Sequence, residues 1–277
     1  MKVGLVFDAS LDKADGVAQY VLTVGNWLTK QGHTVHYLVG ETKRTDLPNL
    51  HSLSRNVTVR FNQNRIQTPL PAKKSVIKAL LAKESFDVLH VMMPYSPFMA
   101  ARVIKAAGPK TAIVGTFHIA PASWVVNAGN KLLGLWLHRN LKLFNSFISV
   151  SSVAQEFAKS THGIDSVVIP NTAPLDKFFG AKPLAEYAKT QTVVFLGRLV
   201  ERKGCQHLLA AVAKLVRDEK WPSGAKVVVC GDGPLKLRLT QFVHEHGLTE
   251  IVEFKGFITE ADKPRYLASA DIAVFPS

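Results

Sequence analysis

The sequence predicts an α/β protein made of two Rossmann-like domains, each a doubly wound parallel sheet, with the second domain incomplete. Short apolar runs rich in β-branched residues alternate with segments of helical periodicity along all 277 residues. We read these runs as apolar on both faces, which is typical of parallel strands buried between two layers of helices. In chain order they are residues 2–7, 34–39, 57–61, 87–91, 112–117, 147–151, 167–170, 192–197, 225–231, 251–256 and 272–277.

The segment between the first two runs predicts a helix. Its apolar residues recur at spacings of three and four, and a glycine follows where a C-terminal cap is expected. The apolar positions are Val17, Tyr20, Val21, Val24, Trp27 and Leu28, and the glycine is Gly32. Strand, helix and strand in this order form a βαβ unit, and its repetition predicts parallel sheets with helices on both faces.

A stretch of mixed polarity marks the boundary between the domains. Residues 170–191 hold three prolines and a glycine, which interrupt the alternation of strands and helices. We therefore predict an N-terminal domain over residues 1–170, a linker over 171–191 and a partial C-terminal domain over 192–277. The second domain has four recognisable strands and no helix after the last, so we expect a C-terminally truncated sheet.

The composition is that of a soluble globular protein. Apolar residues make up 47% of the chain, enough for two hydrophobic cores. The apolar run at the N-terminus spans only residues 3–7 before Asp8 interrupts it, so no signal peptide is predicted. Cys205 and Cys230 indicate reduced thiols of an intracellular protein rather than a disulfide framework or a metal site.

The net charge of +13 is spread unevenly. Residues 1–170 hold 19 Lys and Arg against 9 Asp and Glu, whereas residues 171–277 hold 15 against 12. A lopsided positive field favours an anionic partner such as a membrane surface, a nucleic acid or a phosphorylated substrate.

A basic loop in the second domain indicates an anion site. The stretch 195–204 reads as a strand end followed by Arg198, Arg202 and Lys203, with a helix beginning near Cys205. Cationic side chains beside the free N–H groups of a helix N-terminus suit a diphosphate. A solvated surface loop is the alternative, and the loop alone does not decide between the two.

The stretch 227–239 repeats this geometry one unit later. Its strand leads into a turn with Gly231 and Gly233, and Pro234 stands in the first turn of the next helix. Glycine lets a backbone approach a ligand closely, although a plain tight turn has the same signature. Both loops are expected at the same carboxyl edge of one sheet, which favours a nucleotide there.

The carboxyl edge of the first domain holds a glycine and two histidines. Gly16 opens a helix, so its backbone N–H is a candidate phosphate donor, with a simple glycine cap as the alternative. His90 and His118 each end a strand, where ligand-facing groups project. A single histidine is more often structural, and His118 is the better functional candidate.

A lysine-rich stretch at residues 71–85 has two interpretations. Lys73, Lys74, Lys78 and Lys83 are set against Val76, Ile77, Leu80 and Leu81. The pattern fits a helix lying on an anionic bilayer, where each nearby Lys contributes about 1 kcal/mol. Periodicity alone slightly favours an ordinary amphipathic helix with its apolar side in the core.

Taken together, these motifs resemble the retaining glycosyltransferases of the GT-B fold, family 4, and in particular the phosphatidylinositol mannosyltransferases. The matching stretches, in order, are DGVAQYV, FDVLHV, VGTFH, IPN, FLGRLVERKG, GDGP, FKGF and ADIAVFPS. The resemblance implies an N-terminal acceptor domain and a C-terminal nucleotide-sugar domain. It also implies that Arg198 and Lys203 hold the donor diphosphate with help from the Gly16 N–H, and that His118 touches the transferred sugar. The loop around Phe257, Ile258 and Lys263 would border the nucleotide base, close to Gly231 and Gly233.

The activity implied by the resemblance is transfer of a hexose, with mannose favoured, to a phosphatidylinositol-type lipid with retention of configuration. The donor would be a nucleotide-diphosphate sugar, with GDP-mannose favoured, and no cofactor would be tightly bound. A divalent metal is compatible with the family, but no residue pattern indicates one. The protein would be cytoplasmic and peripheral on the inner face of the membrane, with Lys73, Lys74 and Lys78 toward the lipid.

The sequence departs from the family pattern at several points. Asp15 precedes Gly16, Met92 and Met93 replace polar groups after His90, and Thr172 stands where a glycine is usual. The family's glutamate-rich loop, whose carboxylates bind the sugar and the ribose, does not follow residues 272–277. We therefore expect a fragment with little activity.

Two alternative functions are also compatible with parts of the sequence. A non-catalytic basic module could bind an anionic membrane or a nucleic acid, but no stacking aromatics are interleaved with the basic residues, so nucleic acid is not expected. A dinucleotide oxidoreductase is the weaker rival, because no G-x-G-x-x-G motif follows the first strand.

Overall fold

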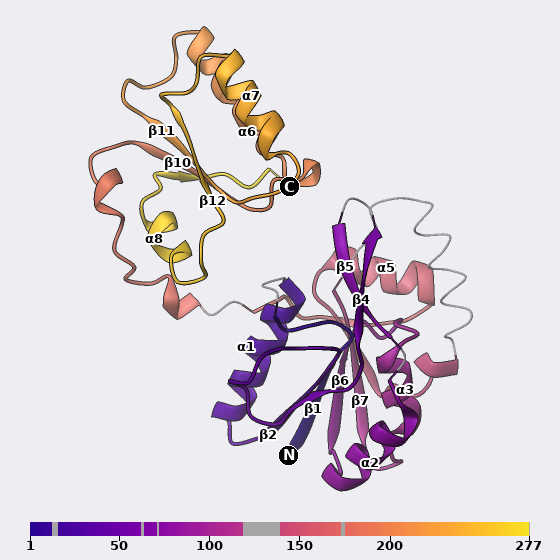
Figure 1. Ribbon diagram of the computed structural model, residues 1–277. Helices are drawn as coiled ribbons and strands as arrows, with labels where there is room; N and C mark the ends of the chain where they lie inside the picture. Colours follow the sequence, from indigo (N-terminus) through magenta and orange to yellow (C-terminus); the bar gives the residue numbers. More distant parts are fainter. Residues whose placement is uncertain (13–15, 62–63, 71, 119–138, 173–174, 277) are drawn as a thin grey trace. The chain divides into compact units, whose positions relative to one another are not determined.

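The computed structural model describes residues 1–12, 16–61, 64–70, 72–118, 139–172 and 175–276, and for residues 58–61 and 64–69 the backbone alone. The chain forms two compact units, Met1–Ala173 and Pro174–Ser277. Each unit is built around a parallel sheet (Figure 1). The predicted fold class, with two parallel-sheet units and the second sheet smaller, is confirmed.

The sheet of the first unit has seven strands in the order β3-β2-β1-β6-β7-β8-β9, all parallel to their neighbours. The strand order reverses beside β1, which pairs with β2 on one side and β6 on the other. Ligands bind at such switch points in open α/β sheets. The strands are β1 Lys2–Phe7, β2 Thr34–Val39, β3 Leu50–Ser52, β6 Val88–Met92, β7 Ala112–Phe117, β8 Ser146–Ser149 and β9 Val167–Val168.

Helices cover both faces of this sheet (Figure 1). Side chains alternate along a strand, and in β1 Leu5 and Phe7 pack with α1, whereas Val6 packs with α2 and α3. A strand that is buried on both sides must be apolar at every position, which is why β1 was readable from the sequence. The helices are α1 Gly16–Lys30, α2 Lys74–Glu84, α3 Met99–Ala106 and α5 Ser152–His162.

One predicted parallel strand is wrong. The run at residues 57–61 lies in β4 (Asn56–Phe61), which pairs antiparallel with β5 (Asn64–Pro69) in a separate two-stranded sheet. The run alternates apolar residues with Thr58 and Arg60, and such alternation is typical of a strand that is not buried on both faces.

The second unit has a four-stranded parallel sheet in the order β12-β11-β10-β13. One face packs Phe195 and Val229 against α6 and α7, and the other packs Val194 and Val228 with Tyr187 and Ile258. The strands are β10 Thr192–Leu196, β11 Lys226–Cys230, β12 Val252–Gly256 and β13 Ile272–Ala273. The helices are α6 Cys205–Arg217, α7 Lys236–Glu245 and α8 Lys263–Ala268, with 3₁₀ turns η1 Leu175–Lys177, η2 Ala185–Tyr187 and η3 Glu201–Lys203.

The stretch expected as a linker contributes to the second unit. Tyr187 is buried, and its hydroxyl donates to the Glu253 carboxylate at 2.8 Å. The Leu184 backbone N–H donates to the Ser269 hydroxyl, also at 2.8 Å. These contacts hold residues 184–187 against the face of the sheet that α6 and α7 leave uncovered.

Candidate functional site

The loops at the carboxyl edge of the second sheet are joined by main-chain hydrogen bonds. The Gly197 N–H donates to the Cys230 carbonyl and the Leu199 N–H to the Asp232 carbonyl, both at 3.0 Å. The Gly231 N–H in turn donates to the Gly256 carbonyl at 2.7 Å. The loops after β10, β11 and β12 therefore form one bonded layer.

Glycine is required in this layer because the backbones touch. A Cβ at Gly231, whose φ is +156°, would lie 1.8 Å from the Gly197 carbonyl oxygen. A Cβ at Gly233 would lie 2.5 Å from the Leu199 carbonyl oxygen. The close approach that the sequence suggested for a ligand is thus made to the neighbouring loop, and the two glycines position that loop.

The basic loop combines cationic side chains with a helix N-terminus. Arg198 is exposed, and Lys203 is half-buried at the end of η3. Gly204, with φ +71°, ends η3 and is the N-cap residue of α6, and no described side chain caps this helix. Burial, reinforced by the charge of Arg202, lowers the pKa of the Lys203 ammonium. An anion in this loop would offset the repulsion between the two cations.

The three residues expected near the base differ in exposure. Phe257 is 77% exposed, whereas Ile258 is buried in the core beside Tyr187. The Lys263 ammonium pairs with the Glu260 carboxylate. Of the three, Phe257 presents a free aromatic face on which a base could stack.

The carboxyl edge of the first sheet brings Tyr20, His90, Thr116 and His118 together. The Tyr20 ring lies edge-on to His118 with centroids 4.8 Å apart, and edge-on to His90 at 6.2 Å. The His90 Nε2 is 2.6 Å from the Thr116 hydroxyl. The sequence analysis identified the two histidines as candidate site residues. It placed Tyr20 only on the apolar face of a helix, and no sequence pattern pointed to Thr116.

Both histidines of this group are neutral at physiological pH. Burial lowers the pKa of His90 to about 4, and burial together with the neighbouring His90 lowers that of His118 to about 4. The His118 Nε2 is 3.4 Å from the Met92 sulfur, which only accepts hydrogen bonds, so the contact favours the tautomer with hydrogen on Nε2. A neutral imidazole can bind a sugar hydroxyl but supplies no charge to a phosphate.

Asp8, directly after β1, is a buried carboxylate that the sequence had marked only as a break in an apolar run. It accepts a hydrogen bond from the Ala100 backbone N–H at 2.7 Å and another from the Ser96 hydroxyl. It therefore caps α3 from a distant part of the chain. Burial raises its pKa to about 6, against the effect of these hydrogen bonds.

Gly16 is exposed and begins α1, and a Cβ built there would meet none of the described residues within 4 Å. Its position at a helix N-terminus with open space beside it is what a backbone phosphate donor needs.

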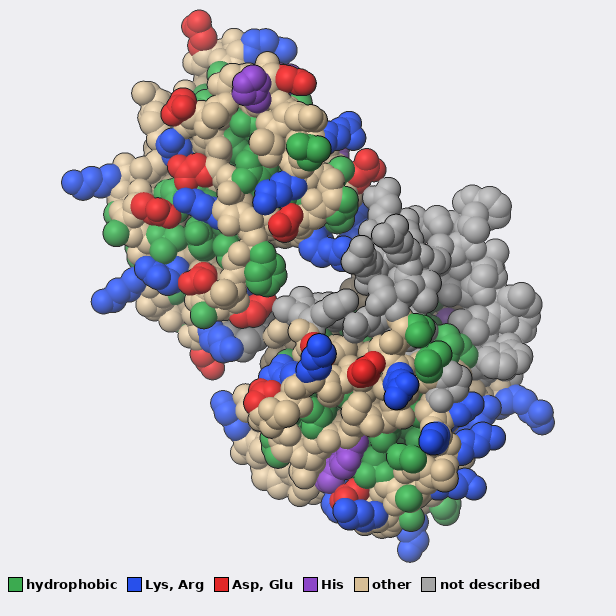
Figure 2. Space-filling model, viewed as in Figure 1, with side chains coloured by type: hydrophobic (Ala, Val, Ile, Leu, Met, Phe, Trp, Pro, Cys, Tyr) green, Lys and Arg blue, Asp and Glu red, His purple; other side chains and the backbone are tan. Residues whose placement is uncertain are grey.

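The lysine-rich helix α2 packs its apolar side into the protein. Ile77 is buried, and Leu80 and Leu81 pack against the cluster that includes α3. The interpretation as an ordinary amphipathic helix with its apolar side in the core holds for these three residues, whereas Val76 is 47% exposed. Lys73, Lys74 and Lys78 are exposed. Figure 2 shows Lys and Arg side chains gathered over the part of the first unit where α2 and α3 lie in Figure 1.

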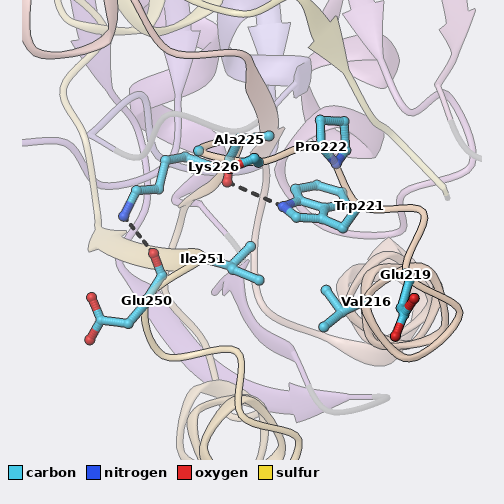
Figure 3. A pocket seen from close by; sticks show the side chains of 10 residues that line it. Val216, Glu219, Trp221, Pro222, Ala225, Lys226, Glu250 and Ile251 are labelled. Atoms are coloured by element: carbon cyan, nitrogen blue, oxygen red, sulfur yellow. Dashed lines mark hydrogen bonds between the residues drawn. The ribbon is translucent and has the colours of Figure 1, made fainter.

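A depression of about 560 Å³ lies at the opposite, amino edge of the second sheet (Figure 3). Trp221, Val216 and Ile251 line it. The Trp221 indole N–H donates to the Ala225 carbonyl at 3.2 Å, and the Lys226 ammonium donates to the Glu250 carbonyl. These polar groups already form hydrogen bonds within the protein. The depression also lies at the end of the sheet opposite to the carboxyl ends of the strands, where ligands usually bind.

Neither a metal site nor a membrane-spanning helix is found in the part of the chain that the structure describes. The described residues contain no group of three His, Cys, Asp or Glu side chains arranged to hold a metal ion. None of the helices in the described ranges has the length and apolarity that crossing a membrane requires.

Comparison with protein families decides the class of the protein. Residues 14–177 match the family described as Glycosyltransferase Family 4, and residues 176–277 match the family described as Glycosyl transferases group 1. The chain belongs to the family 4 glycosyltransferases. The resemblance stated from the motifs is thereby confirmed.

The relatives of this glycosyltransferase include phosphatidyl-myo-inositol mannosyltransferases. That of Mycolicibacterium smegmatis is 30% identical over 100% of this chain and 70% of its own length. That of Propionibacterium freudenreichii is 31% identical over 100% of this chain and 71% of its own length. The match runs through both units.

Solved structures share the fold of this glycosyltransferase. Sucrose-phosphate synthase of Thermosynechococcus elongatus matches with a TM-score of 0.68 and 17% identity, covering 100% of this chain and 75% of the other. HepE of Anabaena, in complex with UDP and glucose, matches with a TM-score of 0.69 and 16% identity, covering 99% and 74%. At these identities the likeness supports the fold alone.

Proposed function

We propose that this glycosyltransferase moves a hexose, with mannose favoured, from a nucleotide-diphosphate sugar to a phosphatidylinositol-type lipid with retention of configuration. The observation that carries the proposal is the identity of 29–31%, over the whole chain, to proteins named phosphatidyl-myo-inositol mannosyltransferases. GDP-mannose is accordingly the favoured donor.

The donor diphosphate is assigned to the loop between β10 and α6. Arg198 and Lys203 supply two positive charges beside the N-terminus of α6, and the bonded layer of glycines fixes the backbone that carries them. A leaving diphosphate gains negative charge in the transition state, so fixed cations at this place lower the barrier. Gly16 is proposed as a further backbone donor, and Phe257 as the ring nearest the base.

His118 is assigned to the transferred sugar. Because the pKa of His118 is held at about 4, the imidazole is neutral and acts by hydrogen bonding rather than by charge. The reaction then depends on cationic stabilisation of the diphosphate and on the orientation of the sugar, without an acidic histidine.

We assign contact with the membrane to the exposed side of α2. Most of the apolar side of the helix is used in the core, so Lys73, Lys74 and Lys78 would act electrostatically on anionic lipid headgroups. The protein would then be peripheral on an anionic membrane surface, which we propose to be the inner face of the cytoplasmic membrane.

The test is transfer of labelled sugar into extractable lipid. The chain is incubated with GDP-[¹⁴C]mannose and vesicles that contain phosphatidylinositol, and the organic phase is counted, with UDP-glucose and vesicles without phosphatidylinositol as parallel arms. We expect any lipid-soluble label that forms to require GDP-mannose and phosphatidylinositol together, and to be lost in Arg198→Ala. Lipid-soluble label from UDP-glucose but not from GDP-mannose would contradict the proposed donor. Label in vesicles that lack phosphatidylinositol would contradict the proposed acceptor. Vesicle binding with no transfer from any donor would favour the non-catalytic basic module.

A further inference from the structure

Tyr20 lies where α1 meets the carboxyl edge of the first sheet. The side chain is 6% exposed, and its ring stands at 69° to that of His118 with centroids 4.8 Å apart. α1 begins at Gly16, so Tyr20 follows one helical turn later on the same face. The helix therefore links the proposed phosphate donor to the ring that contacts His118.

The phenol of Tyr20 is itself held in place. Thr116, which is fully buried in β7, interacts with the Tyr20 hydroxyl and also lies 2.6 Å from the His90 Nε2. His90 is buried and contacts the Tyr20 ring edge-on. The Tyr20 ring is thus fixed from the strand side by two buried groups.

The His118 ring has few other polar contacts. The Nε2 meets the Met92 sulfur at 3.4 Å, which is a weak acceptor, and the buried Nδ1 has no hydrogen-bond partner among the described residues. An imidazole with one weak hydrogen bond is free to turn unless packing prevents it. The edge-to-face contact with Tyr20 provides that packing.

We propose that Tyr20 is a positioning residue that fixes the orientation of the His118 ring toward the transferred sugar. The inference rests on the proposed function for the role of His118 in transfer, but the contact between the two rings does not. Loss of the ring would leave donor binding largely intact and misplace the group that orients the sugar. A misplacement of about 1 Å can cost about a hundredfold in rate.

The first test is spectroscopic and needs no activity. In protein labelled at histidine, with His118 assigned by His118→Gln, we expect cross-relaxation between the His118 and Tyr20 ring protons. His118 should stay neutral down to pH about 5. In Tyr20→Leu its pKa should move toward the ordinary value, because the cavity admits water, whereas Tyr20→Phe keeps the ring and should keep the low pKa. Among the residues that the structure describes, the groups facing His118 are His90, Tyr20 and Met92.

The second test is kinetic, with a matched control that packs against the same helix. Tyr37 of β2 is also buried, and its hydroxyl packs against Gly25 of α1, so Tyr37→Leu removes a similar side chain at a point on the helix far from Tyr20. We expect Tyr20→Leu to lower kcat about tenfold or more with donor KM changed less than about threefold. Tyr20→Phe should restore kcat, and Tyr37→Leu should leave it within about threefold of wild type.

Three results would overturn the proposal. They are no cross-relaxation between the two rings in the wild-type protein, an unmoved His118 pKa in a folded Tyr20→Leu, or equal losses of kcat in Tyr20→Leu and Tyr37→Leu. If Tyr20→Leu does not fold, the presence or absence of cross-relaxation between the two rings in the wild-type protein decides whether the proposal stands. If the wild-type protein transfers no sugar, the proposed function fails while the spectroscopic arm still judges the ring contact.

Discussion

Gly231 and Gly197 meet backbone to backbone, so that a Cβ at position 231 would stand 1.8 Å from the Gly197 carbonyl oxygen. The Gly197 N–H bonds to the carbonyl of Cys230, the residue before Gly231. The loop that carries Arg198 is therefore positioned by the absence of a side chain on its neighbour.

Gly231→Ala should destabilise the second unit by about 3 kcal/mol or more, because the new methyl cannot avoid the neighbouring carbonyl. Gly247→Ala is the control, since Gly247 has φ +66° but open space around it, and strain alone should cost about 1 kcal/mol. Urea unfolding of both variants measures the difference. Equal costs would show that the backbone contact at Gly231 is unimportant.

Asp8→Asn should change how stability depends on pH. The folded pKa of Asp8, about 6, lies above its ordinary value of 3.8, so the folded state binds this proton more tightly. That contribution to stability is present at low pH and is lost as the pH rises through 6. The variant cannot titrate here, so its stability relative to wild type should rise by about 1 kcal/mol between pH about 5 and about 7.5.

The control for this prediction is Asp165→Asn, which removes an exposed carboxylate paired with Lys159. Urea unfolding at the two pH values compares the three proteins. If Asp8→Asn follows the same pH dependence as wild type, the Asp8 carboxyl does not take up a proton in this range.

Replacement of Lys73, Lys74 and Lys78 by Glu should weaken binding to anionic vesicles about tenfold or more, because each lysine near the surface contributes about 1 kcal/mol. The control variant reverses Lys189, Lys214 and Lys220, which are exposed in the second unit, and so changes the net charge equally. Co-sedimentation with phosphatidylinositol vesicles measures binding, which should fall with added salt. If the two variants weaken vesicle binding equally, binding depends on the net charge of the protein and not on the lysines of α2.

The sequence predicted what depends on local patterns and missed what depends on distant contacts. β1 was readable because both of its faces are buried, and Arg198 because charge beside a helix start is visible in the chain. The β4 strand was misassigned because a short run with alternating residues was grouped with buried strands. The roles of Asp8, Tyr20 and Thr116 come from partners up to 98 residues away, in the case of Tyr20 and His118, and no local pattern indicates them.

The central claim is that the β10–α6 loop holds the diphosphate of a nucleotide sugar, and calorimetric titration tests it most directly. GDP and GMP are titrated into the chain and into Arg198→Gln and Lys203→Gln, with Arg217→Gln as the control for loss of charge at the far end of α6.

We predict that GDP binds about tenfold or more tightly than GMP, that Arg198→Gln and Lys203→Gln each remove most of this difference, and that Arg217→Gln keeps it. Equal affinity for GDP and GMP in the wild-type chain, or full GDP affinity in both loop variants, would contradict the claim.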